Sequence, residues 1–164
     1  MRFFVSLFNF WRTLGRRWNL PYFDWTIRLG RSRFGFSHDL VLENSDPYLE
    51  RWIIWFGISL RLHKFHKGDD DRAFHDHPWW FITLPLRKYR ELTPQNPSKE
   101  IKAYHLYFRR SGHRHIVKLM STKPVWTLIL AGRKTRDWGF WNGSRFTRAD
   151  DWLEKVSEQR SNQV

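Results

Sequence analysis

A series of short segments with strand character, separated by turn residues, constrains the fold of this chain most. Between residues 58 and 63 apolar and polar residues alternate, which is the period of a half-buried strand. Six further segments have strand character: 79–84, 88–92, 101–109, 113–119, 125–131 and 135–141. Turn-forming Gly, Pro, Asn and Ser lie between them. This spacing predicts an all-β sandwich or barrel of antiparallel sheets, not an alternating βαβ fold.

Two short helices are predicted outside this series. Asp46 followed by Pro47 is typical of a helix start and predicts a short helix that includes residues 48–52. The capping-box pattern that begins at Thr147 predicts a C-terminal helix through residues 151–156. The remaining residues, 157–164, are polar, and we expect a frayed tail.

The N-terminal segment is basic and aromatic. Residues 1–36 contain seven Arg and one Asp, interleaved with Phe and Trp, and the apolar residues between positions 3 and 18 recur at helical spacing. We predict a basic amphipathic helix before Pro21, within an arm over residues 1–36 that packs on a β-sandwich domain of residues 37–156. Contact of this arm with nucleic acid, a membrane surface or a partner chain is the alternative.

Composition narrows the classes of function. The 164 residues suit one domain with one core. The chain has no Cys, so a transition-metal site must use His and carboxylate ligands. The net charge of +13 favours polyanionic partners, and the sequence has no apolar run long enough to span a membrane. The N-terminus reads as mature sequence and not as a signal peptide, so we expect a cytoplasmic protein.

Two pairs of alternating histidines suggest a metal site. His75 and His77 are separated by one residue, so on a strand both imidazoles point to one side and can hold one ion. Pro78 and the aromatic residues after it would stiffen the segment and exclude water. His113 and His115 form a second pair, and His115 is the expected ligand because it lies closer to the apolar residues of its strand.

Other residues are weaker candidates. His113 is either a neighbour of the ligands, an acid or base, or an exposed turn residue. Asp71, in the acidic run 69–71, is either a ligand, an acceptor for an imidazole N–H, or a solvated turn residue. His63 is the reserve ligand, because its strand leads toward the H-x-H segment. All these histidines could also be ordinary surface or core residues.

The motifs resemble those of the cupin superfamily, whose fold is a jelly roll or double-stranded β-helix. Gly68, His75 and His77 match the first cupin motif with one extra residue in the gap, but Phe81 and Ile82 stand where the cupin glutamate ligand is expected. The segment 110–115 approximates the second motif and keeps its glycine and histidine. The similarity covers residues 57–141, and the longer string is similar to small cupin-like proteins of phages and prophages.

The resemblance implies a three-histidine metal site of His75, His77 and His115. Such a set holds Fe(II) for dioxygen chemistry in some cupins, and it also suits zinc, nickel or copper. It implies a metal-dependent enzyme of dioxygenase or hydrolytic type and a phage origin, with the host cytoplasm as its location. The candidate pocket residues are the walls Phe81, Trp126 and Trp138 and the anion-binding arginines Arg61, Arg133 and Arg136. No catalytic residue is assigned.

Two other functions remain open. The charge and the aromatic residues would suit a protein that binds single-stranded nucleic acid by phosphate contacts and base stacking. A viral accessory protein that binds a host protein through its aromatic arm is the second alternative. In either case the metal site would be vestigial or structural. Pairing of edge strands would make the protein a homodimer.

Overall fold

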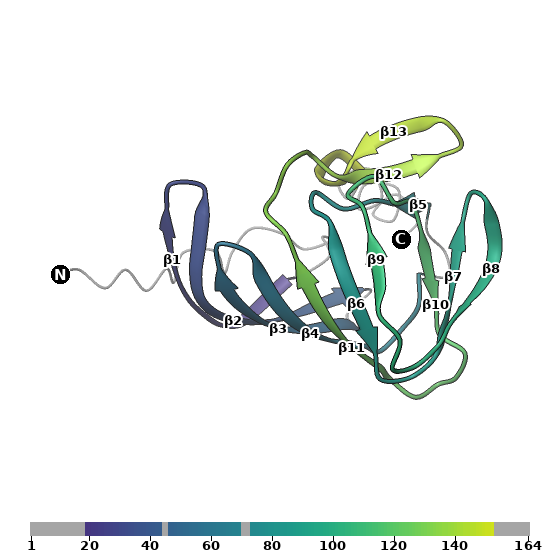
Figure 1. Cartoon of the computed structure of the whole chain (residues 1–164), viewed down its shortest axis with the longest axis horizontal. Helices are drawn as coiled ribbons and strands as arrows, with labels where there is room; N and C mark the ends of the chain where they lie inside the picture. Colours follow the sequence, from purple (N-terminus) through teal and green to yellow (C-terminus); the bar gives the residue numbers. More distant parts are fainter. Residues whose placement is uncertain (1–18, 44–45, 70–72, 153–164) are drawn as a thin grey trace, which may run out of the picture.

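Strands make up nearly all of the regular structure. The computed structural model describes residues 19–43, 46–69 and 73–152, shown in Figure 1. In this part of the chain lie β1 Asn19–Leu29, β2 Ser32–Glu43, β3 Asp46–Phe56, β4 Ser59–Phe65, β5 Phe74–His75, β6 Phe81–Pro85, β7 Tyr89–Thr93, β8 Asn96–Ile101, β9 Tyr107–Arg109, β10 Ile116–Lys118, β11 Val125–Ala131, β12 Gly139–Asn142 and β13 Arg145–Arg148. None of the described helical segments is long and apolar enough to cross a membrane. The predicted all-β class is confirmed.

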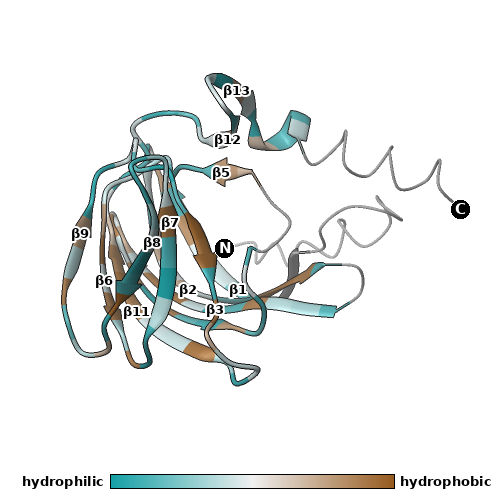
Figure 2. Cartoon of the chain, turned by 90° about the vertical axis from the view of Figure 1, so that its right-hand side faces the viewer, coloured by the Kyte–Doolittle hydropathy of each residue, from teal (hydrophilic) through white to brown (hydrophobic). Residues whose placement is uncertain are grey.

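The strands form one large antiparallel sheet and two small ones. The large sheet has the order β1-β2-β3-β4-β11-β6-β9, and the small sheets have the orders β10-β7-β8 and β13-β12-β5. Figure 1 shows β7, β8 and β10 near the β6 and β9 end of the large sheet, and β1 at its opposite end. In Figure 2 the large sheet is strongly curved, and β5 and β12 lie across its open side. The curvature brings strands from all three sheets around one interior.

The second part of the predicted N-terminal arm is a β-hairpin. β1 pairs with β2 along its whole length, and the turn at Gly30 has a positive φ of 58°, which glycine adopts without strain. β2 continues the hairpin by pairing with β3, so residues 19–36 extend the large sheet. Alternating aromatic and β-branched residues favour this outcome. The helix predicted between residues 3 and 18 lies outside the described residues.

The helix predicted from Asp46 is wrong. Residues 46–56 form β3, which pairs with β2 on one side and β4 on the other. The Asp-Pro signal is local, whereas residues 52–56 are Trp, Ile, Ile, Trp and Phe, which fit a pleated sheet better than a helix. Two neighbouring strands satisfy the β3 backbone, and these long-range pairings outweigh the capping signal.

Two other predicted elements differ in extent. The strand predicted over residues 101–109 is two strands, because β8 ends at Ile101 and β9 begins at Tyr107. Between them Tyr104 has a φ of 60°, and its amide N–H donates to the Pro85 carbonyl at 2.8 Å. At the C-terminal end, residues 149–152 are helical, so the predicted helix starts two residues earlier than expected. Its continuation and the tail lie outside the described residues.

The inner face of the large sheet buries a group of polar side chains among apolar ones, and its outer face is largely apolar. Cross-strand register and alternation place Ser59, Arg61 and His63 of β4 on one face with Thr127 of β11, and all four are buried. We call this the inner face. The opposite, outer face carries exposed apolar side chains from five of the seven strands, with half-buried Leu60, Leu62 and Ile82 of the other two strands between them. The exposed residues are Phe23, Trp25, Ile27, Leu29, Phe34, Ile54, Phe56, Leu128 and Phe108.

Two apolar clusters flank the polar part of the interior. One consists of Tyr89, Ile101, Val117 and Val125, which join the β10-β7-β8 sheet to β11. The other consists of Phe81, Ile129 and Ala131, with Trp79 packed against it. The second cluster borders the H-x-H segment, because Trp79 packs against it and the Phe81 ring lies 4.7 Å from that of His77.

Candidate metal centre

Backbone pairing places His75 opposite His115. His75 lies in β5 and pairs with Phe140 of β12. Its other edge meets His115 in an isolated antiparallel bridge, in which the two residues exchange N–H···O bonds of 3.1 and 2.9 Å. Directly opposed residues of an antiparallel pair project their side chains to the same side. The two predicted motifs therefore meet through their backbones.

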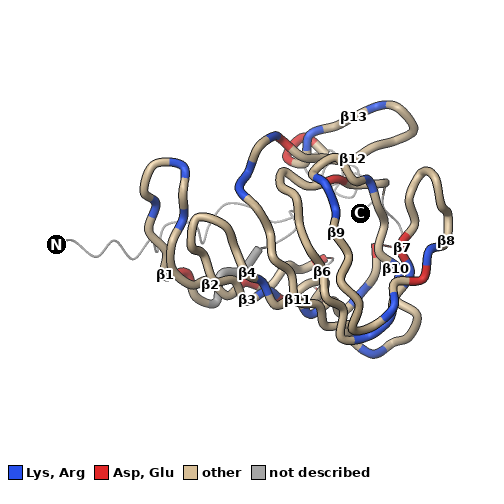
Figure 3. The backbone as a smooth tube through the Cα atoms, in the orientation of Figure 1, with Lys and Arg blue, Asp and Glu red and all other residues tan. Residues whose placement is uncertain are grey.

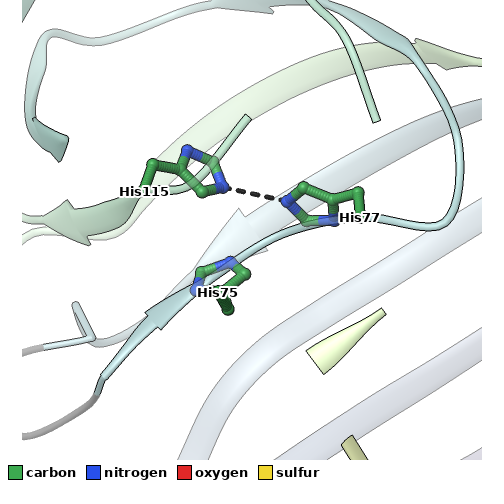
Figure 4. A group of neighbouring side chains, drawn as sticks. All are labelled: His75, His77 and His115. Carbon is green, nitrogen blue, oxygen red and sulfur yellow. Dashed lines mark hydrogen bonds between the residues drawn. The ribbon is translucent and has the colours of Figure 1, made fainter. Parts of the chain in front are cut away.

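The three predicted ligands converge. Nitrogens of His75, His77 and His115 all lie within 4.8 Å of one another. The Nε2 atoms of His77 and His115 face each other at 2.9 Å, as Figure 4 shows. The ring centroid of His75 lies 4.7 Å from that of His115 and 5.1 Å from that of His77. One residue of β5, one of the loop after it and one of an isolated bridge just before β10 thus bring their imidazoles together.

The spacing of these nitrogens suits a common metal ion. Imidazole nitrogens bind a transition metal at about 2.1 Å, so two of them at right angles would be separated by about 3.0 Å. The separation of 2.9 Å between the His77 and His115 Nε2 atoms is close to that value. Burial lowers the pKa of His77 well below its ordinary value, and neighbouring His115 and Arg61 act in the same direction. His77 is therefore in the neutral form that a metal requires.

Glu91 fixes the ring of His115. Its Oε1 atom accepts a hydrogen bond from His115 Nδ1 at 2.7 Å and one from His113 Nε2 at 3.1 Å. Arg109 donates to the same carboxylate through Nε at 3.2 Å and Nη2 at 2.6 Å. Because Nδ1 carries the proton, Nε2 of His115 presents a lone pair toward His77. A carboxylate behind a histidine ligand is a frequent arrangement in metal sites.

These contacts keep Glu91 ionised. Burial by itself would raise its pKa, but the hydrogen bonds from His113, His115 and Arg109 outweigh burial and hold the pKa far below the usual range. Ionised Glu91 can only accept hydrogen bonds, so it selects the Nδ1–H tautomer of His115.

A second cluster overlaps the first. Ligand atoms of Glu91, His113 and His115 also lie within 4.8 Å of one another. However, Arg109 occupies both oxygens of Glu91, and both histidines donate to the same oxygen. A cation there would have to displace an arginine and two protons. Among the described residues, the group of His75, His77 and His115 is therefore the better metal site.

Two buried aspartates hold the backbone around the site. Asp69 accepts hydrogen bonds from the Tyr48 hydroxyl at 2.6 Å and the Val117 amide at 3.0 Å, and its Oδ2 lies 3.8 Å from His75 Nδ1. It joins β3 and β10 beside the first histidine. Asp71, the candidate ligand predicted in the acidic run 69–71, lies outside the described residues.

Asp76, between the two histidines, points away from them. Its fully buried carboxylate accepts hydrogen bonds from the Gly139 amide at 3.0 Å, Trp141 Nε1 at 3.0 Å and Arg136 Nη1 at 2.7 Å. Alternation along an extended chain explains this, because residue 76 faces the side opposite residues 75 and 77. Asp76 therefore attaches the H-x-H segment to β12 and cannot act as a ligand.

The other predicted site residues fall in different places. Phe81 lies in the interior, with its ring centroid 4.7 Å from that of His77. Arg61 and His63 lie on the inner face of β4, His63 outside the three-histidine group. Trp138 packs against Phe140 at a tilted angle, with ring centroids 5.9 Å apart, and the Phe140 ring centroid is 6.1 Å from that of His75.

Two pocket candidates do not face the histidines. Trp126 lies on the outer face, where it stacks on Trp52 at 5.5 Å, and Arg133 is exposed. His113 contacts Glu91 and is within 5.3 Å of the His115 ring, as a neighbour of the group and not a member of it.

Sequence reasoning missed Glu91, Arg109 and the role of Asp76. A signal for Glu91 exists, since it alternates with Tyr89 in the predicted strand and both side chains face inward. A lone acidic residue at an inward position requires a buried partner, so this position predicts an ion pair or a polar cluster. The identity of that partner depends on the sheet order and is not readable from the chain.

Comparison with known proteins gives the fold. No protein-family model matches the chain, and no curated protein matches it. Among solved structures it is similar to Fe(II) HppE, with a TM-score of 0.51, 8% identity and coverage of 58% of this chain and 56% of that one. The chain thus spans little more than half the length of that protein.

Two further structures are similar at lower scores. A sugar phosphate isomerase of the cupin superfamily from Silicibacter pomeroyi has a TM-score of 0.45 and 14% identity, over 61% of this chain and 77% of that one. A double-stranded β-helix protein from Klebsiella pneumoniae has a TM-score of 0.43 and 14% identity, over 66% and 85%. At these identities the likeness concerns the fold alone. The chain has a cupin-like double-stranded β-helix fold, as its motifs predicted.

Proposed function

We propose that this protein binds one divalent transition-metal ion through His75, His77 and His115 and uses it in an enzymatic reaction. The observation that supports this most is the 2.9 Å approach of the His77 and His115 Nε2 atoms, with His115 Nδ1 held by Glu91. Two imidazoles pointing their Nε2 atoms at one point, one of them with its tautomer fixed from behind, suit metal coordination.

Iron or zinc is the expected metal, with nickel and copper as alternatives, because imidazole ligands alone do not select among them. When bound, such an ion would supply a Lewis acid and open positions for substrate. The chain's own residues orient the ligands and exclude water: Glu91 holds His115, and Phe81 packs against His77. We favour an oxygen-dependent reaction over hydrolysis, since the resemblance to three-histidine cupins implies Fe(II).

The test is metal binding by protein purified without a histidine tag. Chelator-treated protein is titrated with Fe(II) under anaerobic conditions and with zinc, nickel and copper, and stoichiometry and thermal midpoint are measured. We expect one equivalent of one of these metals to bind and to raise the midpoint. His75→Ala and His77→Ala should each lose this binding, whereas His105→Ala, which changes an exposed histidine, should keep it. Binding that is absent from the wild type, or equal in all variants, contradicts the proposal.

Nucleic-acid binding, a host partner, a phage origin and a homodimer stay predictions. Figure 3 shows Lys and Arg spread over the β1–β2 hairpin, β9, β13 and the region of β8 and β10. This distribution does not form one continuous basic stripe along the described strands. The net charge of +13 therefore favours anionic partners in general without marking a particular surface.

A further inference from the structure

Three buried polar side chains on the inner face have hydrogen-bonding atoms that no described residue satisfies. They are Arg61 through Nη2, His63 through both ring nitrogens, and Thr127 through Oγ1. His63 of β4 and Thr127 of β11 are direct cross-strand partners, and Arg61 lies two residues before His63 on the same face. The unsatisfied atoms thus belong to one patch on two neighbouring strands, which we call the inner polar patch.

Such a concentration is unusual for a protein interior. Buried polar atoms are nearly always hydrogen-bonded, because water is lost without compensation otherwise. Arg61, His63 and Thr127 are 4%, 8% and 1% exposed. A ligand that accepts hydrogen bonds would satisfy Arg61, Thr127 and one tautomer of His63 at once.

Arg61 is held in a fixed position with one edge unused. Its Nε donates to Ser59 Oγ at 2.8 Å, and its guanidinium carbon lies 4.1 Å from the ring centroid of Trp79 and 5.2 Å from that of Trp55. These contacts fix the guanidinium plane and leave Nη2 without an acceptor. Planar, preorganised guanidinium groups recognise carboxylates and phosphates well.

The charge of Arg61 is only partly compensated. Asp39 is the carboxylate that acts on it, but Asp39 already pairs with Arg51. Burial, together with Arg51 and Arg33, lowers the pKa of Arg61 to about 9, although Asp39 acts in the opposite direction. Arg61 is therefore still protonated at neutral pH, as a buried cation whose local surroundings contain more arginines than carboxylates.

The inner polar patch lies beside the three histidines. Trp79, which stacks on Arg61, is two residues after His77 and packs against Phe81, whose ring contacts both His77 and His115. Arg61 also acts electrostatically on His77. A small molecule held at the patch would therefore have its remainder close to the ligand nitrogens.

We propose that Arg61, His63 and Thr127 bind an oxyanion, the carboxylate or phosphate-type group of a small acidic substrate, and so position that substrate beside the three histidines. The substrate role rests on the proposed metal-dependent function, whereas oxyanion binding itself does not. Arg61 supplies the charge, and His63 and Thr127 supply directional hydrogen bonds. The Trp79 ring, 4.1 Å from the guanidinium carbon, holds the guanidinium in place.

The test uses the full-length, metal-free protein with inorganic phosphate and, separately, acetate, measured by calorimetry and by thermal midpoint. We expect at least one of the two anions to bind in the wild type. Arg61→Gln should weaken that binding about 10- to 100-fold, as expected for a hydrogen bond to a charged group. Arg133→Gln, which changes an exposed arginine, should leave it unchanged. The anion that binds more tightly identifies the type of oxyanion.

A second variant keeps the test decisive if Arg61→Gln does not fold. Thr127→Val keeps the side-chain shape and removes only the hydroxyl, and it should weaken anion binding about 2- to 10-fold. Failure of both anions to bind the wild type, or binding that is unaffected by Arg61→Gln and Thr127→Val, overturns the proposal. The His75→Ala variant should keep anion binding. Metal binding and anion binding can therefore fail independently, so the two proposals are tested separately.

Discussion

Glu91 connects His115, one of the three proposed metal ligands, to the buried cation Arg109. Its carboxylate accepts hydrogen bonds from both residues and from His113 while only 1% exposed. Replacing the carboxylate by an amide would remove the charge that favours the Nδ1–H tautomer of His115 and would leave Arg109 buried without a counter-ion.

We therefore expect Glu91→Gln to weaken metal binding about 10- to 100-fold and to lower the free energy of unfolding by about 3–5 kcal/mol. Metal titration and urea unfolding measure the two effects. Glu100→Gln, which changes an exposed carboxylate paired with Lys88, is the control and should leave metal affinity unchanged. Unchanged metal affinity in Glu91→Gln would show that Glu91 serves stability alone.

His63 should make the metal-free protein sensitive to mild acid. Burial lowers its pKa well below the ordinary value, and Arg51 and Arg61 lower it further. In the unfolded chain its pKa is about 6.5. Below that pH the unfolded state takes up a proton that the folded state does not. The stability is therefore complete above about pH 6.5 and declines as the pH falls toward the folded-state pKa.

The slope of the unfolding free energy against pH is the quantity that His63→Leu should change. Between pH 6.5 and 5 we expect this slope to fall by up to about 1.4 kcal/mol per pH unit. Urea unfolding of metal-free protein at several pH values measures it. The exposed His105, replaced by Leu, should leave the slope unchanged. Equal slopes in wild type and His63→Leu would show that His63 is protonated in the folded protein.

At the residue scale, the sequence predicted the side chains that alternation determines. His75 and His77 share a side because they are two residues apart, and their convergence with His115 follows from a short antiparallel bridge. Glu91 and Arg109 were not predicted, because their contact joins β7 to β9 across two different sheets. Local patterns contain no information on such pairings.

The segment that includes β5 is short and depends on attachment to its neighbours. β5 has two residues, and the next residue, Asp76, accepts hydrogen bonds from the Gly139 amide and the Trp141 indole of β12 and from Arg136, which precedes β12. The histidines on both sides of Asp76 are positioned by these bonds. An element of this length has too few ladder hydrogen bonds to hold a metal site by itself.

We expect Asp76→Asn to lower the free energy of unfolding by about 3 kcal/mol, because it removes a buried charge partner of Arg136, and to weaken metal binding as well. Asp137→Asn is the matched control, since Asp137 pairs with Lys134 and Arg148 at the surface, and it should change stability little. Chemical unfolding and metal titration of both variants test this. Equal stabilities of the two variants would contradict the structural role of Asp76.

Element prediction succeeded where the local pattern and the tertiary pairing agree. The short apolar segment 125–131 lies between turn residues and is the strand β11, with the same bounds. It failed at Asp46–Phe56, where a capping signal predicts a helix but neighbours on both sides impose a strand. The hairpin of β1 and β2 was also missed, because the arginines of this segment indicated a basic arm and obscured its alternation.

For the whole molecule, the two short motifs predicted the double-stranded β-helix, which the structure and its similarity to Fe(II) HppE support. The structure also shows what stands in place of the cupin glutamate, which was expected at position 81 or 82. Phe81 packs against His77 at 4.7 Å, so an apolar ring occupies that position, and Glu91 approaches from another strand to contact His115 from behind. A carboxylate is thus present near the site in a different role.

The apolar outer face of the large sheet has a thermodynamic consequence. Trp25, Ile27 and Leu29 are 71%, 61% and 63% exposed, while the inner face buries arginine, histidine and threonine. Unfolding therefore exposes less new apolar surface and more new polar surface than is usual. Apolar exposure raises the heat capacity of unfolding, and polar exposure lowers it.

We expect the heat-capacity change on unfolding to fall below the usual value of about 12–15 cal/mol/K per residue. Scanning calorimetry at a concentration where sedimentation shows a monomer measures it, with a soluble protein of similar length as reference. A value in the usual range for the monomer would contradict this expectation. If the heat-capacity change reaches the usual value only at concentrations where a dimer forms, then a second copy covers the outer face. The temperature of maximum stability would then depend on protein concentration.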